Sequence, residues 1–231
     1  METLNKQELF DYYNERAPEY EEFYDGHTSA RKIDPALIRK EIAEIKEILP
    51  DYVKGSILDV ACGTGYWLPY YYKDCPRITL VDQSENVLSE CRKKIAELGI
   101  ADKTEVLRAD IFSHRFTPQK FDTVLIAFLI SHFSDEEIDG LLESIRAAVN
   151  PGGSFIFIDN IWNEMVESFA FRKYGTHTRY LKDGRQFRIL KRYFTPDDMS
   201  ELAGKHNFSL DLGYSGEVFL LACGTFRGEK P

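Results

Sequence analysis

The sequence is poor in the residues that build disulfide frameworks and metal clusters. Its 231 residues include only four cysteines and five histidines, and neither type recurs at the short paired spacings typical of disulfide-rich or metal-binding domains. We therefore expect reduced cysteines, mostly in the core, because free cysteine is among the most frequently buried residues. No metal site is predicted.

Long apolar runs and an excess of positive charge are also missing. No run approaches the length that crosses a bilayer, and residues 1–10 are polar and charged, unlike a signal peptide. The net charge of −9 disfavours non-specific binding to nucleic acid or anionic membrane by the protein as a whole. The sequence predicts one soluble, cytoplasmic domain, since a chain of this size that is 43% hydrophobic can bury a substantial core.

Apolar runs and amphipathic segments alternate along most of the chain. An amphipathic helix over 33–49 comes first; strands are then predicted at 57–60, 77–81, 104–109, 121–128 and 154–158, with helices at 66–72, 84–98 and 134–149 between them. Such repeats predict an α/β fold with a mainly parallel sheet covered on both faces. After a helix over 195–205, the runs 208–212 and 217–223 are close enough to pair as a hairpin, so we expect the last strand to be antiparallel.

A glycine-containing turn follows the first predicted strand. Gly63 and Gly65 permit backbone angles closed to other residues and allow a ligand to approach the main chain. Asp82 ends the next strand, 17 residues past Gly65, where a carboxylate could accept hydrogen bonds from ribose hydroxyls. A nucleotide-like ligand or a merely tight turn would both explain the glycines. Leu68 stands where the dinucleotide fingerprint has its third glycine, so NAD is disfavoured.

Charge is distributed unevenly between two segments. Residues 1–25 hold eight acidic and two basic residues, with six aromatic residues among them, whereas residues 172–192 hold eight basic residues and one acidic residue. The aromatic residues could cap a ligand or only hold the arm to the core. The basic segment contains a hairpin turn signal, Asp183-Gly184. It could bind an anionic substrate or a nucleic-acid backbone, pair with the acidic arm, or form a solvated face.

Five motifs, in order, resemble those of class I S-adenosylmethionine-dependent methyltransferases, and the resemblance spans about residues 55–226. They are the first motif at 58–65 (Leu-Asp-Val-Ala-Cys-Gly-Thr-Gly, with Ala61 where many members have glycine), the acidic ribose loop at 81–84, the adenine loop at 108–111, the fourth motif at 121–132 and the fifth at 150–153. The resemblance implies a Rossmann-like, seven-stranded, mainly parallel sheet with an antiparallel last strand and helices on both faces. We expect a single domain, 1–231, with an N-terminal helical arm at 1–50 and a β-hairpin insert at 160–194 as a lid.

The resemblance also implies S-adenosylmethionine as the cofactor and a role for each matching residue. Asp59, Ala61, Gly63 and Gly65 would hold the methionine moiety, Asp82 the ribose hydroxyls, and Asp110 the adenine amino group beside Ala109 and Ile111; Gln83 and Ala127 complete the predicted cofactor site. His132 is the candidate general base if the acceptor is a hydroxyl or an ammonium group, or else it orients its loop. The candidates for the acceptor pocket are Tyr20, Tyr24, Trp162, His177 and Arg179.

Three functions remain open. The first is methyl transfer to a small-molecule acceptor, which could be anionic; the second is methyl transfer to RNA or protein, which the basic segment would serve. The third is a module that binds the cofactor without catalysis. Residues 127–130, Ala-Phe-Leu-Ile, stand where many enzymes that methylate base or glutamine nitrogens have Asn-Pro-Pro-Tyr. This difference favours a small-molecule acceptor over RNA or protein.

Overall fold

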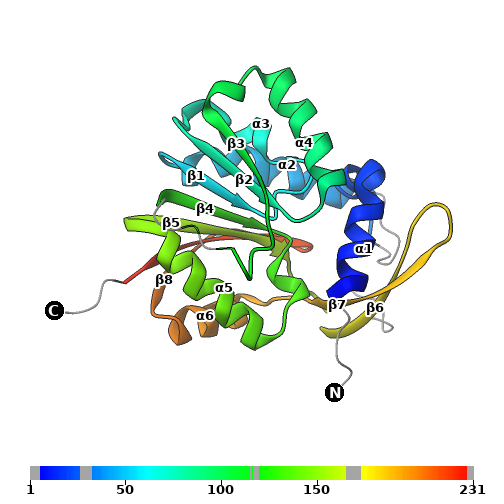
Figure 1. Cartoon of the computed structure of the whole chain (residues 1–231). Coiled ribbons are helices and arrows are strands. Elements are labelled where there is room, and N and C mark those ends of the chain that lie inside the picture. The colour runs from blue at the N-terminus through cyan, green and yellow to red at the C-terminus, as the bar shows by residue number, and fades with distance from the viewer. Residues whose placement is uncertain (1–5, 27–32, 115, 117–119, 165–172, 228–231) are drawn as a thin grey trace.

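The computed structural model of the chain describes residues 6–26, 33–114, 116, 120–164 and 173–227. Its centre is a seven-stranded sheet in the order β3-β2-β1-β4-β5-β9-β8 (Figure 1). The first five strands in this order are parallel, and β9 is antiparallel to both of its neighbours, which confirms the predicted sheet. The strands are β1 (Ile57–Val60), β2 (Ile78–Asp82), β3 (Thr104–Arg108), β4 (Phe121–Ala127), β5 (Val149–Asn160), β8 (Phe208–Ser215) and β9 (Phe219–Phe226).

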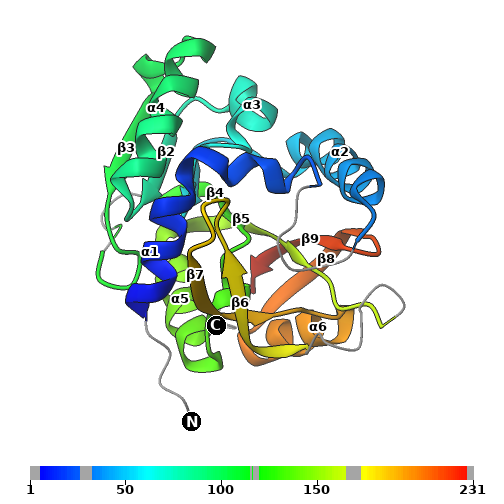
Figure 2. The same ribbon diagram turned by 90° about the vertical axis from the view of Figure 1, so that its right-hand side faces the viewer.

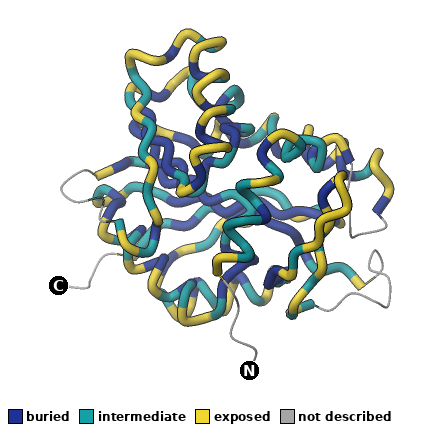
Figure 3. The backbone as a smooth tube through the Cα atoms, turned by 45° about the vertical axis from the view of Figure 1, so that its right-hand side comes forward, coloured by how far each residue is buried: buried dark blue, intermediate teal, exposed yellow. Residues whose placement is uncertain are grey.

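Helices cover both faces of this sheet because its strands are apolar on both sides. In β1, Ile57 packs toward α2 (Pro35–Tyr52), α3 (Leu68–Tyr71) and α4 (Glu85–Leu98), whereas Leu58 and Val60 pack toward α5 (Asp135–Ala148) and α6 (Pro196–Lys205). Successive side chains of a strand point to opposite faces, so each strand supplies both cores. Figure 3 shows the buried backbone concentrated along these strands.

The predicted helix ends and cysteine states are largely confirmed. Ser84 caps α4, Gly99 ends it in the left-handed region, and Ser134 forms a capping box with Glu137 at the start of α5. Three cysteines are buried, Cys223 is half-buried, and all four are unpaired. The helix predicted over 66–72 shrinks to the single turn of α3, followed by a 3-10 turn at Tyr72–Asp74. The fifth motif lies inside β5, whose pairing with β4 shifts register there.

An N-terminal helix and a hairpin lie outside the main sheet. These are α1 (Lys6–Arg16), followed by the 3-10 segment Ala17–Phe23, and the two-stranded sheet of β6 (Tyr174–Tyr180) and β7 (Gln186–Arg192). Figure 2 shows α1 beside this hairpin, in front of the ends of β4 and β5. The hairpin confirms the prediction from Asp183-Gly184, and Gly184 has the positive φ, 88°, that such a turn requires.

The acidic arm and the basic hairpin pair with each other. Arg185 Nη1 lies 2.9 Å from Glu15 Oε2, Lys182 Nζ is bound to Glu22, and the backbone N–H of Arg188 donates to Glu8 Oε1 at 2.6 Å. Part of the opposite charge of these two segments is therefore neutralised by contacts between them. Among the described residues, no helix is long and apolar enough to cross a membrane, and no group of three or more potential ligands is placed to hold a metal ion.

Candidate active site

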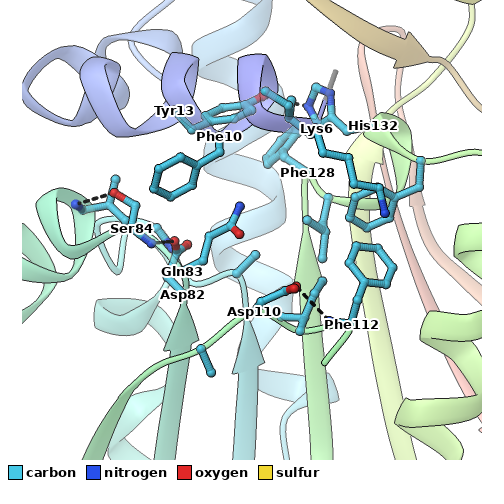
Figure 4. Close-up of a pocket in the computed structure, with 18 of the residues that line it drawn as sticks. Lys6, Phe10, Tyr13, Asp82, Gln83, Ser84, Asp110, Phe112, Phe128 and His132 are labelled. Carbon is cyan, nitrogen blue, oxygen red and sulfur yellow. Dashed lines mark hydrogen bonds between the residues drawn. The ribbon is translucent and has the colours of Figure 1, made fainter. Parts of the chain in front are cut away.

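A cavity of about 580 Å³ opens where β1, β2, β3 and β4 end, beneath α1 (Figure 4). The topology puts it there: β1 lies between β2 and β4, and ligands of open parallel sheets bind beyond the carboxyl ends of the strands where the order reverses. Its volume is in the range of small-molecule sites. The predicted cofactor residues that line it are Ala61, Gly63, Asp82, Gln83, Ala109, Asp110, Ile111 and Ala127.

The turn after β1 presents its backbone to this cavity. Ala61, Gly63 and Gly65 have φ values of 54°, 56° and 71°, a region in which a side chain is strained. Gly63 lines the cavity. Gly65 does not; a Cβ atom there would lie 2.8 Å from Cys91 Sγ, so this glycine lets the turn pack closely on α4.

Asp82 is held rigidly at the end of β2. Its carboxylate accepts hydrogen bonds from the backbone N–H groups of Gly63 at 3.1 Å and Ser84 at 2.9 Å. Burial raises the pKa of Asp82, while these hydrogen bonds act in the opposite direction. A carboxylate has more lone pairs than two donors use, so Asp82 can also accept from ligand hydroxyls in the cavity.

Asp59 points away from the cavity, although it belongs to the same motif. It alternates with Leu58 and Val60 and therefore lies on the opposite face, where Tyr71 of α3 donates to its Oδ2 at 2.7 Å. Burial raises the pKa of Asp59 to about 7. In the free protein, Asp59 holds α3 to the sheet.

The wall after β3 combines an apolar slot with a carboxylate. Ala109 and Ile111 line the cavity beside Phe112 and Phe133, whose ring centroids are 4.9 Å apart. Asp110 accepts a hydrogen bond from the Phe112 N–H at 3.0 Å, which fixes the loop. A flat ring that carries an amino group matches these surroundings.

The helix α1 forms the roof of the cavity. Lys6, Phe10 and Tyr13 share one face of it, and Figure 4 shows Phe10 and Tyr13 reaching toward the cavity opposite Gln83 and Asp82. The sequence analysis did not assign these residues to the site. Their spacing of four and three positions, which places side chains on one helix face, was the signal that could have found them.

His132 is buried and neutral at the edge of the cavity. Its Nδ1 lies 2.8 Å from the carbonyl oxygen of Leu190, which can only accept, so Nδ1 carries the proton. Its Nε2 lies 2.7 Å from the hydroxyl of Tyr13 and must then accept from it. Burial, followed by the charge of Lys191, holds the pKa of His132 well below its usual value, and burial raises that of Tyr13.

The five acceptor-pocket candidates separate into three groups. Tyr20 lines the cavity. Tyr24 is outside it and stacks on Tyr66 with centroids 3.6 Å apart, which holds the arm to the core. Trp162 and His177 lie beside Tyr193, each with its ring centroid 6.0 Å away, and Arg179 follows on the same face of β6 as His177; these three are not among the residues that line the cavity.

Comparison with known proteins finds a matching domain family and a similar solved structure. Residues 57–153 match the family model described as a methyltransferase domain. A solved structure described as the DhpI-SAM-HEP complex shares 26% identity and a TM-score of 0.75 over 96% of this chain and 100% of that chain. Residues 57–153, which include the turn after β1 and the loops after β2 and β3, are therefore similar to methyltransferase domains, and the chain shares the fold of that solved structure.

Curated relatives match this chain over part of their length. A demethylmenaquinone methyltransferase of Bacteroides fragilis is 29% identical over 145 residues, 62% of this chain and 56% of that protein. The aclacinomycin 10-hydroxylase RdmB of Streptomyces purpurascens is 29% identical over 157 residues, 67% of this chain and 40% of that protein. The chain thus spans about half the length of these relatives.

Proposed function

We propose that this protein binds S-adenosylmethionine in the cavity and transfers its methyl group to a small-molecule acceptor. The observation that carries the proposal is the convergence of three strand ends on one cavity: the exposed backbone after β1, the fixed carboxylate of Asp82 and the apolar slot beside Asp110. Gly63 and Ala61 would contact the methionine moiety, Asp82 and Gln83 the ribose, and Ala109, Asp110 and Ile111 the adenine. Ala127, at the end of β4, would lie beside the same ligand.

The bound cofactor supplies a methyl group activated by a sulfonium, so the protein mainly has to position the acceptor and exclude water. In our proposal α1 and the hairpin form the lid that does this, within a single domain. Lys6 fixes one end of α1, since its Nζ lies 2.7 Å from Glu137 of α5. Asn14 and Glu15 fix the other end through Ser84 and Arg185.

The pair of Tyr13 and His132 provides a route for the acceptor's proton. An acceptor hydroxyl or ammonium group at the cavity wall would give its proton to the Tyr13 oxygen as the Tyr13 proton passes to His132 Nε2. Loss of this proton would leave the acceptor's electron pair free to bond to the methyl carbon that the bound cofactor would supply, and the electron pair of the broken carbon–sulfur bond would stay on sulfur. Because Nδ1 remains bonded to Leu190, the imidazole keeps its orientation throughout.

Two other functions receive less support. Methylation of RNA or protein would draw on the basic hairpin, but two of its charged groups, Lys182 and Arg185, are bound to the acidic arm. Cofactor binding without methyl transfer is the second candidate, and it is favoured by one observation: a curated relative is named a hydroxylase.

The first experiment is thermal unfolding with S-adenosylhomocysteine, S-adenosylmethionine and NAD at matched concentrations. A ligand present at a hundred times its dissociation constant stabilises a protein by about 2.7 kcal/mol. We expect a shift with the two sulfur ligands alone; a shift with NAD alone would overturn the cofactor assignment. Multiple-turnover formation of S-adenosylhomocysteine with a panel of small acceptors then separates methyl transfer from binding alone.

A further inference from the structure

The inner face of the hairpin brings a cation to the Tyr13–His132 pair. Along β6, Thr178 and Tyr180 are exposed while His177 and Arg179 are half-buried. Arg179 pairs with Phe187 in register, and directly opposite residues of two antiparallel strands share a face. Phe187 packs on Tyr12 of α1, with ring centroids 5.6 Å apart. The Arg179 side chain therefore lies between the hairpin and α1.

One nitrogen of Arg179 is buried without a partner. Its Nη1 has no hydrogen-bond acceptor among the residues that the structure describes. A buried donor left unpaired costs about 1–3 kcal/mol, and more when it is charged. Lys191, on β7 of the same hairpin, differs in this respect: its Nζ lies 2.6 Å from Ser131 Oγ and 3.3 Å from Asp159 Oδ1.

The surroundings of Arg179 carry an excess of positive charge. Its charge lowers the pKa of both Tyr13 and His132, as Lys191 and His177 also do for His132. Arg16 is a second cation whose charge lowers the pKa of Tyr13; it donates to the Tyr12 hydroxyl at 2.7 Å, and its guanidinium is 5.7 Å from the Tyr20 ring centroid. Within the described residues, no ion pair joins Arg16 or Arg179 to a carboxylate.

We propose that Arg179 binds an oxyanion of the methyl acceptor, a carboxylate or a phosphoryl group. The inference rests on the proposed function and names the class of its substrate. A planar guanidinium presents parallel N–H donors that match two oxygens of such a group. Tyr13 and His132 line the cavity and Arg179 does not, so an acceptor anchored at Arg179 would have to reach past this pair, which would bring its nucleophile to the group that takes its proton.

Arg188 provides a matched control on the same hairpin. It pairs with Thr178, and both are exposed, so it lies on the outer face of the hairpin. One of the bonds that Arg188 makes, to Glu8 Oε1, uses its backbone N–H, which remains when the side chain is changed. Arg179→Gln and Arg188→Gln therefore remove the same charge from opposite faces of one element.

The test is calorimetric titration of the protein saturated with S-adenosylhomocysteine, using benzoate, phenylphosphonate and the neutral analogue benzamide as probes. We expect at least one oxyanion probe to bind more tightly than benzamide; which one does so distinguishes a carboxylate from a phosphoryl acceptor. Arg179→Gln should weaken that binding by about tenfold or more, Arg179→Lys less, and Arg188→Gln hardly at all.

Three results would overturn the proposal: no oxyanion probe binding to the saturated wild type, benzamide binding as tightly as the oxyanions, or equal weakening by Arg179→Gln and Arg188→Gln. The titration with S-adenosylhomocysteine, made first on every variant, keeps the two proposals distinct. If the wild type does not bind S-adenosylhomocysteine, the proposed function is rejected. If Arg179→Gln keeps the wild-type affinity for S-adenosylhomocysteine but loses oxyanion binding, the result supports Arg179 as the acceptor site. Thermal unfolding of each variant confirms that it is folded.

Discussion

The strand-end wall of the cavity and its roof are held by different forces. The wall, formed by the turns after β1, β2 and β3, is fixed by backbone bonds such as Cys62 N–H to Val81 O and Ala109 N–H to Asp82 O, both at 3.0 Å. The roof, α1, is held to the hairpin by a small apolar cluster around Tyr12 and by the ion pair of Glu15 with Arg185, whose side chains are 41% and 51% exposed. Exposed pairs contribute little and weaken in salt. The strand-end wall is therefore preformed, and we expect that the roof can be displaced without unfolding the sheet.

Substitution of Gly65 tests the rigidity of the wall and should have the largest effect. We expect Gly65→Ala to lower the free energy of unfolding by about 2–4 kcal/mol, because the new methyl group overpacks against Cys91 and φ is positive. Gly99→Ala is the control: φ there is 66°, but no heavy atom lies within 4 Å of the added Cβ. Denaturant titration should show a smaller loss for Gly99→Ala, and equal losses would mean that close packing of the turn contributes nothing.

Substitution of Asp82 tests whether the wall holds the ribose. Asp82→Ala should weaken binding of S-adenosylhomocysteine by about 1–3 kcal/mol, the range for hydrogen bonds to a charged group. Glu85→Ala, three residues further along and engaged with Arg92 at the surface, should leave the affinity unchanged. Calorimetry on both variants decides the matter; an affinity for Asp82→Ala equal to that of the wild type would remove the ribose assignment.

The stability of the protein should depend on pH through His132, where wall and roof meet. Its folded pKa lies below the unfolded value of about 6.5, so the unfolded chain binds the proton first, and the contribution of the neutral ring is lost as the pH falls below about 6.5. The slope from this group cannot exceed about 1.4 kcal/mol per pH unit. The raised pKa of Asp59 acts in the opposite sense, lowering stability as the pH rises toward 7.

The difference between wild type and His132→Gln isolates the histidine contribution from that of Asp59. Urea titrations from pH 7.5 to pH 5 should show the wild type losing more stability than His132→Gln on acidification. His114→Gln is the control, because it replaces a histidine that does not touch Tyr13; its pH dependence should follow that of the wild type. Parallel curves for wild type and His132→Gln would contradict a neutral His132 in the native state.

The smallest effect should come from the ion pairs that hold the roof. Glu15→Gln or Arg185→Gln should each cost about 0.2–1 kcal/mol, and the coupling between them in a double-mutant cycle should vanish at about 1 M salt. A coupling that persists unchanged at high salt would contradict the contrast between a rigid wall and a salt-sensitive roof.

Sequence predicted the wall far better than the roof, and the contacts explain why. Asp82 and Asp110 follow their strands directly, so local pattern and topology were enough to place them at the cavity. The contact between Tyr13 and His132 joins residues 119 positions apart and depends on how α1 docks on the hairpin, which no local pattern specifies. The position of Asp59 could have been predicted from the sequence. Side chains alternate along a strand, so Asp59 lies on the face opposite its apolar neighbours Leu58 and Val60.

The two parts of the proposed lid, α1 and the β6–β7 hairpin, lie far apart along the chain, and this separation affects when they can pair during folding. Glu15 and Arg185 are 170 residues apart, whereas none of the seven strands of the main sheet includes a residue before Ile57. During synthesis, α1 emerges before β1 to β5 and before its hairpin partner, and closing so long a loop carries the entropic cost of a distant contact. We therefore expect α1 to dock late, over a cavity that the parallel strands have already shaped.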